Sequence, residues 1–432
     1  MNIAPHHAHM PPDTRPEIAL LLCCARTRLD SEHVEQIRTL LREDINWQYL
    51  MQAAHTQKVA LLLYRSLQMY GSLQTNGLKA VPQTFLHQLR RYVQSYAFRN
   101  LFLMRELLKI FRVFETHGIP LIPFKGPTLA SIAYGDFRLR QFGDLEILVR
   151  KSDVLRAKEL LISQGYRLNL TTAQETAHLH SHFHFNFVRN DGRVIVELHW
   201  ALTGKNWPFP FDFERLQACL IPVREIPALC EGVTIHSFPP EDLLLFLCVH
   251  GARHQWQQLL WLCDIAELIR AHPQMEWQRL LEQAKSSGSK RMLLLGLFLA
   301  NDLLGAELPN SVRQSTQEDP KVTVLARQLR AQFSAYATGR PQRDDRSAFR
   351  AHVFLLAVRE RFQDKVQYLV HYPFDLHTSH LQVLFDTARA DEAGRTPLFL
   401  PSFLASFYYR RLRPIQRVAQ YVLRRVKALF RS

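Results

Sequence analysis

The pattern of apolar residues changes twice along this 432-residue chain, and the change restricts the folds open to it. On both sides of residues 119–200, apolar residues recur every three or four positions, as they do in amphipathic helices. Within those limits they form short runs between turn residues, which is typical of strands. We therefore expect an α+β fold, in which a small mixed sheet with flanking helices is embedded in largely helical amino- and carboxy-terminal regions.

Five strands are predicted in the central segment, at residues 119–124, 144–149, 166–170, 178–189 and 193–199. Helices are expected there at about 126–133 and 152–164. Asn190, Asp191 and Gly192 separate the last two strands, and this composition favours a tight hairpin turn. The last two strands are therefore expected to pair with each other.

Helical segments occupy most of the remaining chain. The first is predicted at residues 18–28. Asp30 and Ser31 can cap the second, in which Val34, Ile37 and Leu41 follow helical spacing. Further helices are predicted at 47–69, 82–116, 241–249, 259–271, 275–283 and 288–305. Polar, turn-rich residues at 309–320 and 338–346 are candidate linkers. The predicted organisation is a helical amino-terminal region (1–116), a core (117–205), a helical domain (206–310) and a helical region with a basic tail (311–432).

Paired carboxylates inside an apolar run are the main chemical signal. Asp144 and Glu146 lie two residues apart, so a strand would point both to the same face. Like charges held that close repel each other, and a bound divalent cation relieves the repulsion. Glu197 adds a third carboxylate if its strand lies beside the first. Such a cluster suits a phosphoryl-transfer site in which oxygen ligands hold two magnesium ions about 3.5–4 Å apart.

Basic residues precede the acidic pair. Lys125 and Gly126, ahead of a short helix, offer a cation and a close backbone approach for phosphate oxygens. Arg138 and Arg140 stand just before Asp144 and would neutralise further phosphate charge. A D-x-E pair alone is also common at an exposed sheet edge. The order of these features along the chain favours the functional interpretation.

Together these residues resemble the bacterial family of uncharacterised nucleotidyltransferases, in the superfamily typified by DNA polymerase β. The matching residues are Lys125-Gly126, Tyr134, Arg140, the run from Asp144 to Val149, and the strand from Val196 to Trp200. A later element is also similar, with His250-Gly251, His254, Trp256, Leu259, Trp261-Leu262 and Asp264-Ile265. The resemblance covers about residues 30–305.

The resemblance implies a polymerase β-like core and transfer of a nucleoside monophosphate, most plausibly AMP from ATP, to an acceptor hydroxyl. It implies two Mg²⁺ ions on Asp144, Glu146 and Glu197, with Glu197 helping to activate the acceptor as ligand or general base. Lys125, Gly126, Arg138 and Arg140 would bind the triphosphate. The acceptor is left open: a small molecule, a saccharide or a protein.

Two positions depart from the pattern. Pro127 follows Gly126 where the superfamily has glycine or serine, which removes one backbone donor from the phosphate loop. Glu146 stands where aspartate is usual, and its extra methylene moves the carboxylate oxygens by roughly 1–1.5 Å. An alternative is therefore a catalytically impaired homologue that acts as a binding or scaffold protein, associated with a membrane.

The net charge of +15 and the pI near 9.7 favour polyanionic partners. No acidic residue follows Glu392, and residues 399–430 combine aromatic residues with a basic amphipathic segment. This segment predicts either a last helix packed on the body or contact with an anionic membrane surface. Nucleic acid is the less favoured partner, because no nucleic-acid-binding module is visible.

Histidines and cysteines leave further alternatives. His178, His180, His182 and His184 would share one face of a strand, as a metal site or as part of a sheet face near phosphate. His250 and His254, with Trp256 and Trp261, would either pack in the core or line the nucleotide cleft. The six cysteines form no CxxC pair, which favours free thiols in a reducing compartment. Without a secretory signal or a long apolar span, a cytoplasmic or peripheral membrane location is expected.

Overall fold

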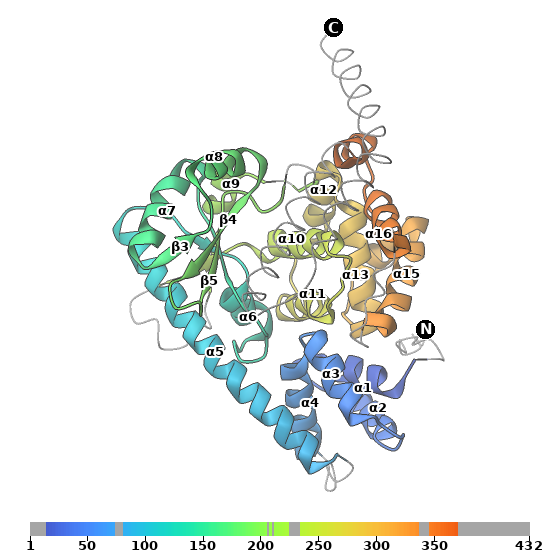
Figure 1. The fold of residues 1–432 in the computed structure, drawn as a ribbon. Helices are drawn as coiled ribbons and strands as arrows, with labels where there is room; N and C mark the ends of the chain where they lie inside the picture. The colour runs from blue at the N-terminus through green and yellow to red at the C-terminus, as the bar shows by residue number, and fades with distance from the viewer. Residues whose placement is uncertain are drawn as a thin grey trace. The chain divides into compact units, whose positions relative to one another are not determined.

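The computed structural model describes residues 14–73, 81–204, 207–209, 211–223, 234–336 and 345–369 (Figure 1). The chain divides into two compact units, of which the first contains residues 1–204 and 209–358. The second contains residues 205–208 and 359–432, and within it the Arg359 guanidinium lies 4.1 Å from the ring centroids of Trp207 and Tyr368. All elements below belong to the first unit. This division does not test the predicted four-part organisation, which stays a prediction.

The predicted α+β fold is confirmed, with a five-stranded mixed sheet between helical regions. Its strands are β1 (Ile122–Pro123), β2 (Leu145–Leu148), β3 (Tyr166–Leu168), β4 (His184–Arg189) and β5 (Ile195–His199), in the spatial order β1-β2-β5-β4-β3. β2 and β5 run parallel, and every other neighbouring pair is antiparallel. The expected hairpin is present, because the Gly192 amide donates to the Arg189 carbonyl (2.8 Å) between β4 and β5.

The strand predicted at 178–189 is wrong in its first half. Residues Thr172–Ser181 form helix α8, and β4 begins only at His184. The reason is a capping box: the Thr171 side chain accepts from the Gln174 amide, and the Gln174 side chain accepts from the Thr171 amide. His178 and His182 are consequently one helical turn apart, with stacked rings 3.8 Å apart, rather than alternate residues of a strand.

Two helices cover the sheet. The long helix α5 (Gln83–Thr116) and helix α7 (Val154–Ser163), which follows the short 3-10 helix η1 (Lys151–Asp153), are predicted from their apolar period and confirmed. Their buried residues form one core with the inward-facing residues of the strands, including Leu107, Phe114, Leu161, Ile147, Phe187 and Leu198. The sheet, α5 and α7 thus share one hydrophobic core.

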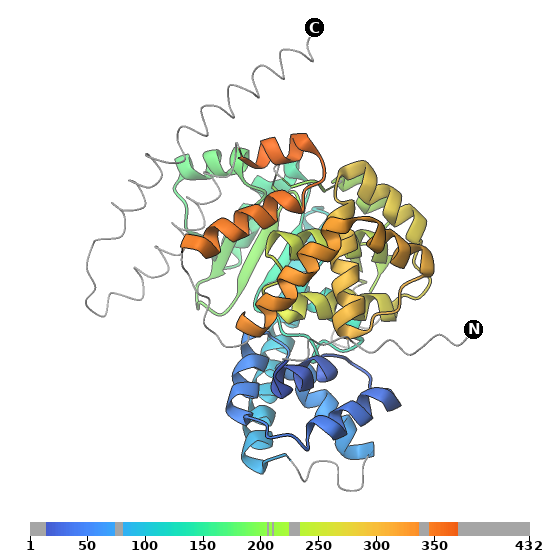
Figure 2. The ribbon, with the colours of Figure 1, turned by 90° about the vertical axis from the view of Figure 1, so that its right-hand side faces the viewer.

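Helices and one two-stranded pair form the other described elements of the first unit (Figures 1 and 2). The amino-terminal group comprises α1 (Pro16–Cys24), α2 (Ser31–Leu40), α3 (Trp47–Thr56) and α4 (Ala60–Leu73), and Asp30 caps α2 as predicted. After the sheet come α9 (Phe213–Ala218), the two-stranded pair β6 (Ile221–Pro222) and β7 (His236–Ser237), then α10 (Pro240–Arg253), α11 (Leu259–Ala271), α12 (Trp277–Ser287) and α13 (Lys290–Leu304).

The linker predicted at 309–320 is wrong. Residues Asn310–Glu318 form helix α14, which is followed directly by α15 (Pro320–Tyr336). Val312 and Thr316 are buried against neighbouring helices, so this polar stretch still has an apolar face. The other candidate linker, 338–346, lies largely outside the described residues, and α16 (Asp345–Ala357) begins at its end.

Within the described ranges, no helix combines the length and the apolar character that a bilayer span requires. The five cysteines there are free thiols, as predicted, and Cys230 lies outside the described residues. The tail at 399–430 also lies outside them.

Candidate active site

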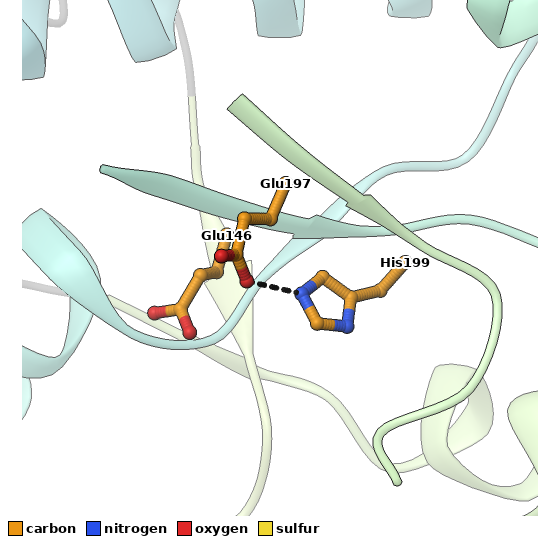
Figure 3. Close-up of side chains that lie close together, drawn as sticks. All are labelled: Glu146, Glu197 and His199. Atoms are coloured by element: carbon orange, nitrogen blue, oxygen red, sulfur yellow. Dashed lines mark hydrogen bonds and ion pairs between the residues drawn. The ribbon is translucent and has the colours of Figure 1, made fainter. Parts of the chain in front are cut away.

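Adjacent parallel strands place two carboxylates side by side. Glu146 of β2 is in direct register with Glu197 of β5. One ligand atom each of Glu146, Glu197 and His199 lies within 4.8 Å of the others, and no other such group of acidic, histidine or cysteine side chains is found in the described part of the chain. Figure 3 shows the three side chains projecting from the two strands into the same space. The expected meeting of Glu146 with Glu197 is therefore present.

His199 is part of this group although the sequence reasoning gave it no role. Its Nε2 lies 3.1 Å from Oε2 of Glu197, and its Nδ1 lies 3.3 Å from the Ala201 carbonyl oxygen. The His184 ring stacks on it at 4.9 Å, because His184 of β4 is in register with His199 of β5. The signal was in the sequence, since Glu197 and His199 are two residues apart and a strand points both to one face.

Lys125 and Gly126 bring the start of helix α6 (Gly126–Tyr134) to the carboxylates. The Lys125 ammonium forms a buried ion pair with Glu146. Gly126 has a φ of 55°, and a Cβ there would lie 3.2 Å from the carbonyl oxygen of Asp144. A side chain would therefore be both strained and crowded, so glycine is required for the helix to start this close to β2.

The charges of the cluster act on one another. The pKa of Glu146 is raised to about 8: burial is the largest cause, the carboxylates of Asp144 and Glu197 add to it, and Lys125 opposes it. Burial also acts to raise the pKa of Glu197, but the hydrogen bond and charge of His199, with His184 and Lys125, hold it well below its usual value. The acidic groups thus outnumber the one ammonium paired with them, and a divalent cation would complete the balance.

Asp144 immediately precedes β2 and is half-buried. It is not a member of the group formed by Glu146, Glu197 and His199, although its charge acts on Glu146. The structure therefore places the predicted acidic residues in one region but brings only Glu146 and Glu197 into close proximity.

The two arginines predicted to bind phosphate are each held by a carboxylate. Arg140 is buried and donates to both oxygens of Asp264 in α11, at 2.7 and 2.8 Å. The Tyr134 hydroxyl donates to the same carboxylate at 2.7 Å. Arg138 is largely exposed and pairs with Asp136. Direct contact of Arg140 with a nucleotide would require this buried pair to open, so its predicted role in binding triphosphate remains a prediction.

The chain matches the family described as uncharacterised nucleotidyltransferase over residues 43–305. It belongs to that family. The matched region includes α3 to α13, all five strands of the main sheet, and every predicted site residue. No curated protein matches the chain. Membership implies a nucleotide substrate and a divalent metal, and the carboxylates of Glu146 and Glu197 are hard oxygen ligands of the kind that magnesium prefers.

A histidine and tryptophan group borders the site of this nucleotidyltransferase. His250 of α10 and His254, which directly follows that helix, are half-buried, and their rings lie 5.5 and 5.2 Å from the ring of Trp261. Burial lowers the pKa of both histidines, and the Lys125 charge lowers it further. These residues therefore lie near Lys125 at the edge of the site. Trp256, by contrast, is almost fully buried over Gly251 and is a core residue.

Proposed function

We propose that this nucleotidyltransferase transfers a nucleoside monophosphate, most plausibly AMP, from a nucleoside triphosphate to an acceptor hydroxyl. The observation that supports the proposal is the register of Glu146 with Glu197, together with the Lys125 ammonium at the start of α6. Two carboxylates and a cation at a helix start suit a metal-bound triphosphate. The acceptor belongs to an open set: a small molecule, a saccharide or a protein.

In the proposed reaction, the acceptor oxygen attacks the α-phosphorus while the bond from that phosphorus to the bridging oxygen of the β-phosphate breaks. Pyrophosphate leaves and the hydroxyl proton is removed. Asp144, Glu146 and Glu197 would hold two Mg²⁺ ions, and Glu197 would help to activate the acceptor as ligand or general base. Bound magnesium supplies Lewis-acid activation and neutralises charge on the triphosphate.

Lys125 has two partners in this proposal. Without nucleotide its ammonium pairs with Glu146. Lys125 also lies at the start of α6, beside the Gly126 backbone, so its ammonium would be available to a phosphate group if the Glu146 carboxylate held a cation. Arg138 and Arg140 complete the proposed phosphate-binding set. Arg140 would contact phosphate directly only if its ion pair with Asp264 opened.

Replacement of Asp144 by alanine tests the activity. We expect Asp144→Ala to reduce Mg²⁺-dependent pyrophosphate release from a panel of nucleoside triphosphates to background, while the melting temperature stays at the wild-type value. The matched control is Asp44→Ala, which removes an exposed carboxylate from a loop of the same unit. Turnover by the Asp144→Ala variant at the wild-type rate would contradict the proposal.

A second function, a binding or scaffold protein with an impaired site, is favoured by Glu146 in place of aspartate and by the arginines already paired within the protein. Calorimetry with magnesium complexes of ATP, GTP, CTP and UTP separates the two functions. Binding of at least one of them favours the transferase, and binding of none favours the scaffold.

In either case we propose that residues 399–430 contact an anionic membrane surface, with nucleic acid less favoured as a partner.

A further inference from the structure

Lys58 occupies a backbone position that normally favours glycine. It follows α3 with a φ of 56°, in the left-handed region. The Lys58 amide donates to the His55 carbonyl at 3.1 Å, and the Val59 amide donates to the Ala54 carbonyl at 2.9 Å. This is the hydrogen-bond pattern of the Schellman motif, in which glycine is the usual residue at the position of Lys58. The turn itself therefore does not explain the lysine.

The same turn is fixed to the part of the chain that carries the site. The Leu259 amide, at the start of α11, donates to Oε1 of the buried Gln57 at 2.7 Å, and the Leu260 amide donates to the Gln57 carbonyl at 3.2 Å. Farther along α11, Asp264 binds Arg140, which lies four residues before Asp144. Lys58 is thus held in place relative to the acidic residues by hydrogen bonds to a buried helix.

The ammonium of Lys58 has the surroundings of a ligand-binding group. The side chain is half-buried, and within the described ranges no hydrogen bond or ion pair holds it. Burial lowers the pKa of Lys58. The charges that act on the ammonium are those of the site: the carboxylates of Asp144 and Asp264 raise its pKa, and the cations of Arg140 and Lys125 lower it. By comparison, Lys125, Arg138 and Arg140 are each paired with a carboxylate.

We propose that Lys58 binds the triphosphate of the nucleotide, so that the turn between α3 and α4 forms one wall of the nucleotide site. The inference rests on the proposed nucleotidyl transfer and adds a residue to it from a region that carries no catalytic motif. A partly desolvated ammonium without a carboxylate partner is stabilised by an incoming phosphate more than one already paired. The strained backbone is retained because the side chain has this role.

Three substitutions in the full-length protein test the inference. Binding of the Mg²⁺ complex of α,β-methylene-ATP is measured by calorimetry for Lys58→Gly, Lys58→Gln and Lys58→Arg. We expect Kd to rise on the order of 10- to 100-fold for the glycine and glutamine variants, the usual range for loss of one charge-assisted hydrogen bond. Arginine is expected to recover most of the affinity. The matched control is Lys151→Gln, an exposed lysine of η1, with wild-type affinity.

Thermal unfolding separates binding from structure. Because glycine suits the left-handed position, Lys58→Gly is expected to keep or raise the melting temperature while it loses affinity. Wild-type affinity in the glycine and glutamine variants overturns the inference but leaves the proposed function intact. A fall in melting temperature together with affinity shows a structural role and also overturns it. If the wild-type protein binds no nucleoside triphosphate, the proposed function fails and the inference fails with it.

Discussion

Glu146 stands where the family pattern has aspartate, and the length of its side chain determines which contacts its carboxylate makes. The carboxylate reaches both the Lys125 ammonium and the group formed with Glu197 and His199. Aspartate at this position would withdraw the carboxylate by roughly 1–1.5 Å from its ion pair with Lys125 and from the group with Glu197 and His199. The contacts of residue 146 therefore fit the longer side chain of glutamate, because the extra methylene carries the carboxylate to the Lys125 ammonium.

From this geometry we expect Glu146→Asp to impair the protein although its charge is unchanged. Metal-dependent nucleotide turnover should fall by about 10²-fold, because misplacement of about 1 Å has that effect on reacting groups. The measurement is steady-state pyrophosphate release across a magnesium titration. Glu159→Asp, the same shortening at an exposed position of α7, is the control. A faster Glu146→Asp variant would show instead that glutamate is the impairing residue.

At the level of single residues, the sequence predicted those site members whose signal is local. Lys125 and Gly126 stand before a helix, and Glu146 and Glu197 alternate with apolar neighbours, so their meeting needed only that β2 and β5 be adjacent. Lys58 gave no such signal. Its relation to Asp144 depends on how α3 and α4 dock on α11, through contacts between residues about 200 positions apart. A left-handed φ at a lysine is likewise visible only in the structure.

The loop between α6 and β2 is held by contacts from two helices. Asn100 of α5 donates to the carbonyls of Phe137 (2.7 Å) and Arg140 (2.9 Å), and Asp264 of α11 binds the Arg140 guanidinium. Asp144 follows directly on this loop. The Arg140 and Asp264 pair therefore fixes the loop that leads into β2 to helix α11.

Loss of the Asp264 charge is expected to destabilise the fold. Asp264→Asn leaves the Arg140 guanidinium buried without a counter-charge, and removal of one partner from a buried pair typically costs about 3–5 kcal/mol. Urea denaturation of both proteins measures the difference in free energy of unfolding. Glu35→Gln, in an exposed pair of α2, serves as the control and is expected to have the wild-type stability. An equally stable Asp264→Asn variant would show that the pair is not structural.

For whole elements, the spacing of apolar residues predicted long helices well. It predicted short helices poorly where a capping box determines the local structure. Helix α5 was predicted to within a residue at each end, because its apolar residues recur at helical spacing and ten of its residues are buried. Helix α8 was missed because alternating histidines imitate a strand, while the Thr171 and Gln174 cap determines the local structure. Helix α14 was missed because only Val312 and Thr316 are buried in a polar sequence.

For the molecule as a whole, the candidate site and all but four residues of the family match lie in the first unit, whereas the basic tail belongs to the second. The formal charge of +15 is far larger than a triphosphate-binding site requires, so a second anionic partner is expected.

Neutralisation of the tail should therefore remove membrane binding without loss of nucleotide turnover. In the full-length protein, Arg413, Arg417, Arg424, Arg425 and Lys427 are replaced together by glutamine. Each basic residue near an anionic surface contributes about 1 kcal/mol, so binding to phosphatidylserine-containing vesicles should fall by orders of magnitude in sedimentation assays.

The control for this experiment removes the same charge elsewhere. Five exposed basic residues of the first unit are replaced by glutamine: Arg42, Arg91, Lys151, Arg193 and Arg279. Both variants have the same net charge, so a difference in vesicle binding reports the position of the charge rather than its amount. If the tail is the membrane contact, only the tail variant dissociates, and wild-type binding itself weakens with added salt. Equal loss in both variants would show that attraction to the vesicles is a property of the total charge and would remove the tail from the proposal.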